Sequence, residues 1–146
     1  MAAISELTWH DGYLLGYGPM DQVHQEFVDI VGRMQQADEA ALPLLLDEFA
    51  AHAKAHFDTE NAWMIATDFP ARDCHIDEHA AVLKSVQEVC ELVAAGNVAI
   101  CRSLVDHLAD WFPGHADYLD SALSHWMSKR RFGGKPVVLR RGIVKE

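Results

Sequence analysis

Two pairs of potential metal ligands, His56 with Glu60 and His75 with His79, are each spaced four residues apart in the middle of the chain. Side chains at positions i and i+4 project from the same face of an α-helix. Each pair can therefore direct two imidazole or carboxylate groups at one point. Pro70, between the two pairs, marks the break between their helices. The spacing predicts a metal site to which two helices contribute four ligands.

Three further side chains of the same chemical types, His24, His115 and Asp120, fall on or beside the apolar faces of other predicted helices. A single histidine on an apolar face is most often an ordinary core residue. A buried carboxylate, however, is costly unless it is paired or bound to metal, and no Lys or Arg shares these faces as a counter-ion. The complete candidate set of ligands is His24, His56, Glu60, His75, His79, His115 and Asp120.

Five imidazoles and two carboxylates exceed the four ligands of a tetrahedral zinc site, and they suffice for two octahedral-like ions with bridging carboxylates. The spacing of His115 and Asp120 differs from that of the other pairs, because five residues turn a regular α-helix through about 140° beyond a full turn. These two side chains therefore serve different roles or require a local change in the helix. Either a π-type bulge or a kink at Pro113 and Gly114 would supply that change.

Apolar side chains recur at helical spacing in four segments that carry these groups. We expect helices from Pro19 to about Met34, from Leu42 to Thr67, from Arg72 to Ala95, and from Val98 onward, with an interruption at Pro113 and Gly114. Gly and aromatic residues without helical periodicity precede them. The predicted fold is all-α, an up-down-up-down four-helix bundle of residues 1–128 with an N-terminal loop arm, residues 1–19, and a short C-terminal extension.

Charge is distributed unevenly along the 146 residues, whose net charge is −10. Residues 1–128 hold five Lys and Arg against 21 Asp and Glu, a net charge of −16, whereas residues 129–146 carry +6. The acidic body argues against nucleic-acid binding. The basic tail, residues 129–146, either docks on the acidic body, remains solvated, or contacts a protein partner or an anionic surface.

Nothing in the chain indicates a signal peptide or a membrane span, because no basic start with an apolar run is present and no stretch approaches about 18 apolar residues. The odd number of cysteines, Cys74, Cys90 and Cys101, lacks metal-site or disulfide spacing. Reduced thiols suit a reducing compartment. We therefore expect a cytoplasmic protein.

The seven candidate ligands, taken in order with their contexts, resemble the ligand signature of the hemerythrin family, specifically its bacterial single-domain form. The similar motifs are His24 in the sequence MDQVH, His56-Phe57-x-x-Glu60, His75-x-x-x-His79 and His115-x-x-x-x-Asp120. The resemblance covers about residues 9–128. Two features depart from the family pattern: Pro113 and Gly114 precede the ligand His115, and Ala116 stands where a bulky aliphatic residue is common.

The resemblance implies a cofactor of two iron ions bridged by an oxide or hydroxide. His75, His79 and His115 would hold one iron, and His24 and His56 would hold the other, which keeps a position open for dioxygen. Glu60 and Asp120 would bridge the two. The residues expected to line the dioxygen pocket, which could equally be plain core, are Phe27, Phe57, Trp111, Phe112 and Ala116. His52, where the family often has Tyr, is a further candidate for a role around the ligands.

The function that the resemblance implies is reversible binding of dioxygen or another small diatomic ligand, as an oxygen carrier, store or sensor rather than an enzyme. The imidazole-rich ligand set favours the ferrous state more than the Glu-x-x-His motifs of ferritin-like proteins would. Two alternatives use the same bundle. One is a di-iron redox enzyme, such as a peroxidase or a nitrogen-oxide reductase, and the other is a bundle stabilised by a different metal.

Overall fold

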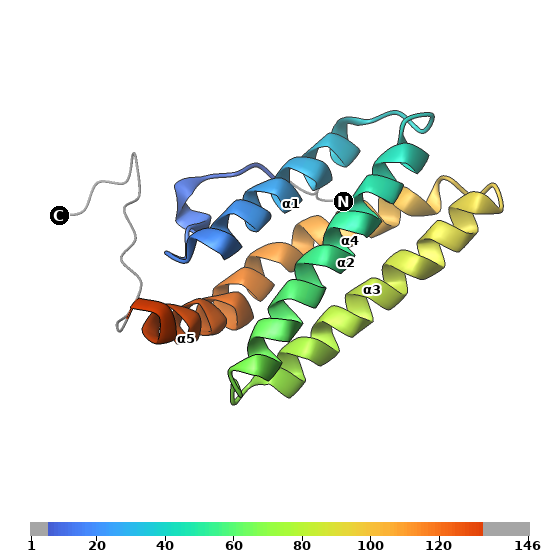
Figure 1. The fold of residues 1–146 in the computed structure, drawn as a ribbon. Coiled ribbons are helices and arrows are strands. Elements are labelled where there is room, and N and C mark those ends of the chain that lie inside the picture. The colour runs from blue at the N-terminus through green and yellow to red at the C-terminus, as the bar shows by residue number, and fades with distance from the viewer. Residues whose placement is uncertain (1–5, 133–146) are drawn as a thin grey trace.

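The computed structural model describes residues 6–132, and every regular element in that part of the chain is helical (Figure 1). The four long helices are α1 (Gly18–Gln36), α2 (Leu42–Ala66), α3 (Arg72–Ala94) and α4 (Ile100–His115), and α5 (Ser121–Phe132) follows α4. Helix α1 packs against α2 and α4, and α3 packs against the same two neighbours. With short connections between successive helices, this is the predicted antiparallel four-helix bundle.

Proline and glycine account for most of the helix boundaries. Pro19 and Pro43 occupy the first turns of α1 and α2, where the missing N–H would have no partner within the helix. Gly96 follows α3 with a φ of 103°, a left-handed conformation that glycine adopts without steric cost. These signals are legible in the sequence, so the predicted and observed helix boundaries differ by only a few residues.

The predicted interruption at Pro113 and Gly114 is wrong, because the helix continues through both residues. Helix α4 extends to His115, residues Ala116–Asp120 form a π-helix, and α5 follows directly. The N–H of Ala116 contacts the carbonyls of both Phe112 and Pro113, and the N–H of Ser121 bonds to the carbonyl of Ala116 five residues earlier. Of the two adjustments considered for His115 and Asp120, the structure therefore contains the π-type one.

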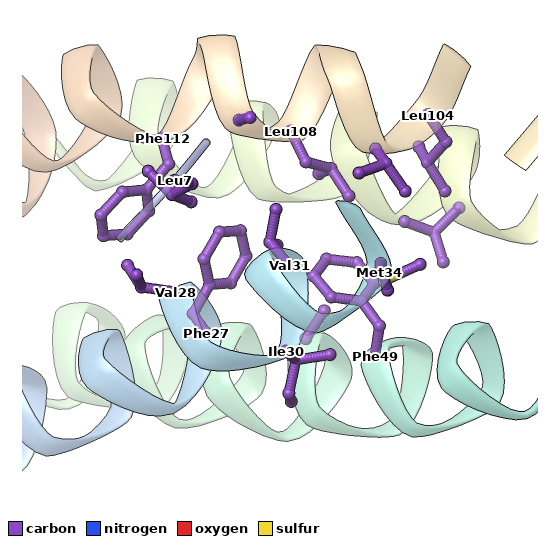
Figure 2. Close-up of a cluster of buried hydrophobic side chains, with 14 of the residues drawn as sticks. Leu7, Phe27, Val28, Ile30, Val31, Met34, Phe49, Leu104, Leu108 and Phe112 are labelled. Carbon is purple, nitrogen blue, oxygen red and sulfur yellow. The ribbon is translucent and has the colours of Figure 1, made fainter. Parts of the chain in front are cut away.

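The larger hydrophobic core consists mainly of buried side chains of α1, α2 and α4 inside the bundle (Figure 2). Leu104 and Leu108 on α4 face Phe27 and Val31 on α1, and Phe49 reaches the same cluster from α2. Each fully buried side chain of this size stabilises the fold by about 1.5–3 kcal/mol relative to exposure. The packed core therefore holds the helix faces that carry the polar groups in fixed positions.

A second, smaller apolar cluster lies where α1, α2 and α5 meet, and it contains Met20, Met64, Leu123 and Met127. The hydroxyl of Ser124 on α5 donates to the carbonyl of Leu15 at 3.0 Å. The N-terminal arm, which contains one short 3₁₀ turn at Asp11–Tyr13, is thereby tied to the last helix. The candidate ligands lie between the two apolar clusters.

Asp21 anchors the arm to the start of α1, since its carboxylate accepts hydrogen bonds from the backbone N–H groups of Leu15 at 2.8 Å and Gly16 at 3.1 Å. Asp21→Ala leaves these part-buried donors without their acceptor. We expect it to lower the free energy of unfolding by about 1–2 kcal/mol, measured by urea denaturation. Asp106→Ala, at an exposed position on α4, is the matched control and should change stability by less than about 0.5 kcal/mol. Equal effects of the two variants would contradict this role for Asp21.

The first four residues of the predicted basic tail, 129–132, belong to α5, and residues 133–146 lie outside the described part of the chain. Arg130 stacks over the indole of Trp126, with its guanidinium carbon 4.3 Å from the ring centroid. Among the described residues, none of the helices combines the length and the apolar character needed to cross a bilayer.

Candidate metal centre

All seven candidate ligands converge at one place inside the bundle. Helix α1 supplies His24, α2 supplies His56 and Glu60, and α3 supplies His75 and His79. His115 is the last residue of α4, and Asp120 is the last residue of the π-helix. Their exposed fractions are at most 6%. The i and i+4 pairs on α2 and α3 lie on the inner faces of their helices, as the spacing predicts.

The seven side chains form two groups that share Glu60. Ligand atoms of Glu60, His75, His79, His115 and Asp120 lie within 4.8 Å of one another, and so do those of His24, His56 and Glu60. Each group is compact enough to hold one cation between its ligand atoms. The geometry therefore offers two adjacent metal sites with a carboxylate in common.

Glu60 extends one carboxylate oxygen to each group of histidines. Its Oε1 lies 3.2 Å from Nε2 of His79 and 3.7 Å from Nε2 of His75. Its Oε2 lies 2.8 Å from Nε2 of His56 and 3.7 Å from Nε2 of His24. A carboxylate divided in this way is suited to bridging two cations.

The two carboxylate oxygens of Asp120 likewise contact different histidines. Its Oδ1 lies 3.1 Å from Nε2 of His75 and 3.2 Å from Nε2 of His115, and its Oδ2 lies 3.1 Å from Nε2 of His24. The π-helix between His115 and Asp120 makes this possible, because its wider turn brings the two side chains of an i, i+5 pair to one point. In a regular helix they would point in different directions.

Buried polar atoms without hydrogen bonds indicate that these residues fit a cation. Nε2 of His24, His75, His79 and His115 makes no hydrogen bond of normal geometry, and neither do Oε1 of Glu60 nor the two oxygens of Asp120. Buried polar groups in native proteins are almost always paired, and each unpaired one costs about 1–3 kcal/mol. Atoms that lie about 3 Å apart without bonding to each other are satisfied when they share a positive ion.

The electrostatics of the cluster also favour a cation. Burial alone would lower the pKa of His24, but the contacts with Asp120 and Glu60 outweigh it and raise the pKa of His24 from 6.5 to about 10. Despite desolvation, the histidines lower the pKa values of Glu60 and Asp120 below their ordinary range. None of the ion pairs that the seven groups form within the described residues includes Lys or Arg. Two buried negative charges thus depend on protons or on metal for compensation.

Two residues that the sequence analysis did not identify orient the histidines. Nδ1 of His79 lies 2.8 Å from the amide oxygen of Asn61, and Nδ1 of His115 lies 2.7 Å from Oε1 of Glu78. An acceptor at Nδ1 selects the tautomer whose unprotonated Nε2 faces the centre. The same oxygen of Glu78 accepts a hydrogen bond from the indole N–H of Trp111 at 2.8 Å. The spacing of Trp111 and His115 on one helix face was the available signal for a shared partner.

The five residues predicted to line a dioxygen pocket surround the centre on the side of the larger core. Phe27 stacks on Phe112 with centroids 4.9 Å apart, and Phe112 meets the ring of His24 edge-on at 5.5 Å. Phe57 stacks on His79 at 4.0 Å. Trp111, which is only partly buried, stacks on His115 at 4.2 Å, and Ala116 is buried in the first position of the π-helix. These rings shield the ligands from water on that side.

Comparisons with known proteins bear on the same part of the chain. Residues 15–124, which include all seven candidate ligands, match the family model described as the hemerythrin HHE cation binding domain. A bacteriohemerythrin from Ralstonia nicotianae is 38% identical over 124 residues, which cover 85% of this chain and 90% of the relative. A bacteriohemerythrin from Stenotrophomonas maltophilia is 23% identical over 139 residues, which cover 88% and 91%.

Proposed function

Since this chain belongs to the hemerythrin family, we propose that it binds dioxygen reversibly at a centre of two iron ions and serves as an oxygen carrier, store or sensor. The observation that carries the proposal is the division of both buried carboxylates, each with one oxygen directed toward each group of histidines. Two relatives of similar length are named bacteriohemerythrins, which supports the same function.

We assign the seven proposed ligands to the two irons as the family resemblance implies. His75, His79 and His115 would hold one iron, His24 and His56 would hold the other, and Glu60 and Asp120 would contribute to both. Two iron ions bound here would supply the reversible binding of dioxygen. Because only two histidines belong to the second group, a diatomic ligand would have room beside His24 and His56.

The side chains around the centre favour reversible binding of dioxygen because they keep water away from it. Phe27, Phe57 and Phe112 are at most 1% exposed and exclude water from the side on which they contact His24, His56 and His79. Exclusion of water would limit the delivery of protons to a diatomic ligand bound at the centre. We therefore place the five predicted pocket residues, Phe27, Phe57, Trp111, Phe112 and Ala116, around the dioxygen ligand.

The deciding experiment is the iron content of the purified protein together with its visible spectrum after anaerobic reduction and again after admission of oxygen. We expect two irons per chain and a visible band that forms with oxygen and disappears on deoxygenation. Irreversible oxidation would instead favour a di-iron redox enzyme. Absence of iron would contradict the proposed function altogether.

Glu78 should tune the centre through His115. In Glu78→Gln the remaining side-chain oxygen can still accept from Trp111 and His115, so the change removes the negative charge and little else. An anionic partner makes a metal-bound imidazole a stronger donor. We expect the variant to keep both irons, to lose about tenfold in iron affinity and to show a higher reduction potential, measured by spectroelectrochemical titration.

The control for Glu78 is Glu88→Gln, an exposed position on the same helix, which should leave the potential unchanged. If the two variants have the same potential as the unchanged protein, Glu78 does not act on the metal through His115.

A further inference from the structure

A cleft of about 150 Å³ lies between α1 and α2, and it reaches two of the proposed ligands. Its floor includes His56 and Glu60, which are buried, together with Met20. Its rim includes the exposed residues Ala55 and Thr59 on α2. The cleft therefore connects solvent with the side of the centre to which His56 belongs.

The cleft exists because the rim residues on α2 are short. Ala55 and Thr59 are four residues apart and project from one face of the helix, beside the ligands His56 and Glu60. At these positions a longer aliphatic side chain would cover the floor. The opening is thus encoded by two side chains that are not themselves ligands.

The floor of the cleft carries a polar atom without a protein partner. His56 is 6% exposed, and its Nε2 lies 2.8 Å from Glu60, whereas its Nδ1 makes no hydrogen bond. The corresponding atoms of His79 and His115 contact Asn61 and Glu78. His56 therefore lacks the protein partner that fixes the ring orientation of those two histidines.

Three larger hollows on the described part of the surface do not reach the centre. Cavities of about 460, 460 and 720 Å³ have none of the seven ligands in their lining. On the side of the larger core, the stacked rings of Phe27 and Phe112 close off His24. The small cleft between α1 and α2 is therefore distinguished by its contact with the ligands and not by its size.

We propose that the cleft between α1 and α2 is the route by which small uncharged molecules reach the centre beside His56 and Glu60, with Ala55, Thr59 and Glu26 as the residues that determine its selectivity. The inference rests on the proposed function, because it assumes iron at this centre. It adds an access path between α1 and α2 to the aromatic surroundings proposed for dioxygen.

Glu26 and His52 define the outer end of the path. Nε2 of His52 lies 3.3 Å from Oε1 of Glu26, and this contact joins α1 to α2 at the edge of the cleft. The Glu26 side chain is 50% exposed and places a negative charge at the outer end of the path. A negative charge at the entrance of a narrow path disfavours anions relative to neutral molecules of the same size.

The first test blocks the cleft. Ala55→Leu should slow the binding of hydrogen cyanide, which is uncharged at neutral pH, to the oxidised iron-loaded protein by at least about tenfold in stopped-flow spectroscopy. Ala62→Leu is the matched control, the same substitution on an exposed part of the same helix outside the cleft, and should bind at the unchanged rate. Thr59→Leu provides a second blocking variant, so the test does not depend on the folding of one protein. Unchanged rates in both blocking variants would overturn the proposal.

The second test removes the charge at the rim. Glu26→Gln should raise the association rate of azide, an anion, about fivefold, which corresponds to roughly 1 kcal/mol for one charge near water. The rate for hydrogen cyanide should change little. Equal effects on the two ligands would contradict the assignment of Glu26 as a selectivity residue.

A third readout does not require iron. Hydrogen exchange at the ring carbon of His56, followed by mass spectrometry on the protein as purified, reports solvent access to the floor of the cleft. Exchange at His56 should be several-fold slower in Ala55→Leu than in Ala62→Leu. If the protein holds no iron, the proposed function fails and this comparison alone decides the cleft. Equal exchange in the two variants would overturn the access route whether or not iron is present.

Discussion

Glu60→Ala is expected to abolish the binding of both iron ions, which would reduce the iron content from two per chain to near zero. Glu60 is the one side chain that belongs to both groups of ligand atoms, so its removal takes an anionic ligand from each ion at once. The loss in affinity should exceed the roughly 10- to 100-fold that removal of an outer partner costs. Metal analysis of the purified variant measures the effect.

Asp58→Ala is the matched control for Glu60→Ala, because Asp58 is an exposed carboxylate on the same helix and pairs with Lys54. This variant should keep two irons per chain. Glu60→Asp is a useful intermediate, since it retains the charge but shortens the reach. Full iron content in Glu60→Ala would show that the shared carboxylate is not a bridging ligand.

Removal of iron is expected to destabilise the protein by an amount that grows as the pH rises. At a free iron concentration about 1,000-fold above its dissociation constant, binding adds about 4 kcal/mol of stability. For a domain of this size that corresponds to roughly 8 to 16 °C in Tm. Thermal denaturation of the iron-loaded and metal-free protein between pH 6 and pH 10 measures the difference.

The sign of this pH dependence follows from His24. Without metal, its contacts with Asp120 and Glu60 outweigh burial and raise its pKa from 6.5 to about 10. The stabilisation is therefore fully present below pH 6.5 and is lost as the pH rises through about 10. In the iron-loaded protein His24 binds as the neutral imidazole and has no such proton to lose. The gap between the two Tm values should thus widen toward alkaline pH.

A metal-free His24→Gln variant tests this origin. Its alkaline decline in stability should be smaller than that of the unchanged chain, although His115, whose pKa is also raised by Asp120 and Glu78 against the effect of burial, retains part of it. A decline of unchanged size would assign the pH dependence to other groups.

The bundle and the convergence of the candidate ligands were predictable because these residue types recur at the helical period in the sequence. His56 with Glu60 and His75 with His79 repeat the helical period within apolar faces, and packing those faces together brings the pairs to one point. Pro19, Pro43 and Gly96 mark helix ends by local backbone geometry alone. None of these inferences requires knowledge of which side chains meet across the bundle.

The features that escaped prediction depend on contacts between helices or on cooperative backbone geometry. Glu78 lies between two candidate ligands on α3 and contacts the centre only because α4 brings Trp111 and His115 to it. The continuation of the helix through Pro113 could not be predicted, because proline usually ends or kinks a helix. The cleft likewise follows from how close α1 lies to the short side chains of α2, which periodicity does not specify.

The π-helix at Ala116–Asp120 has a consequence for everything that follows it in the chain. Such a segment is equivalent to one extra residue within a regular helix. Each residue of an α-helix rotates the chain by about 100° around the helix axis. The side chains of α5 therefore have a rotational phase that a regular continuation of α4 would not give them. Leu123 and Met127 face the second apolar cluster, and Ser124 reaches the arm at Leu15, in this phase. The same extra residue that lets Asp120 join His115 thus sets which face of the final helix is inside.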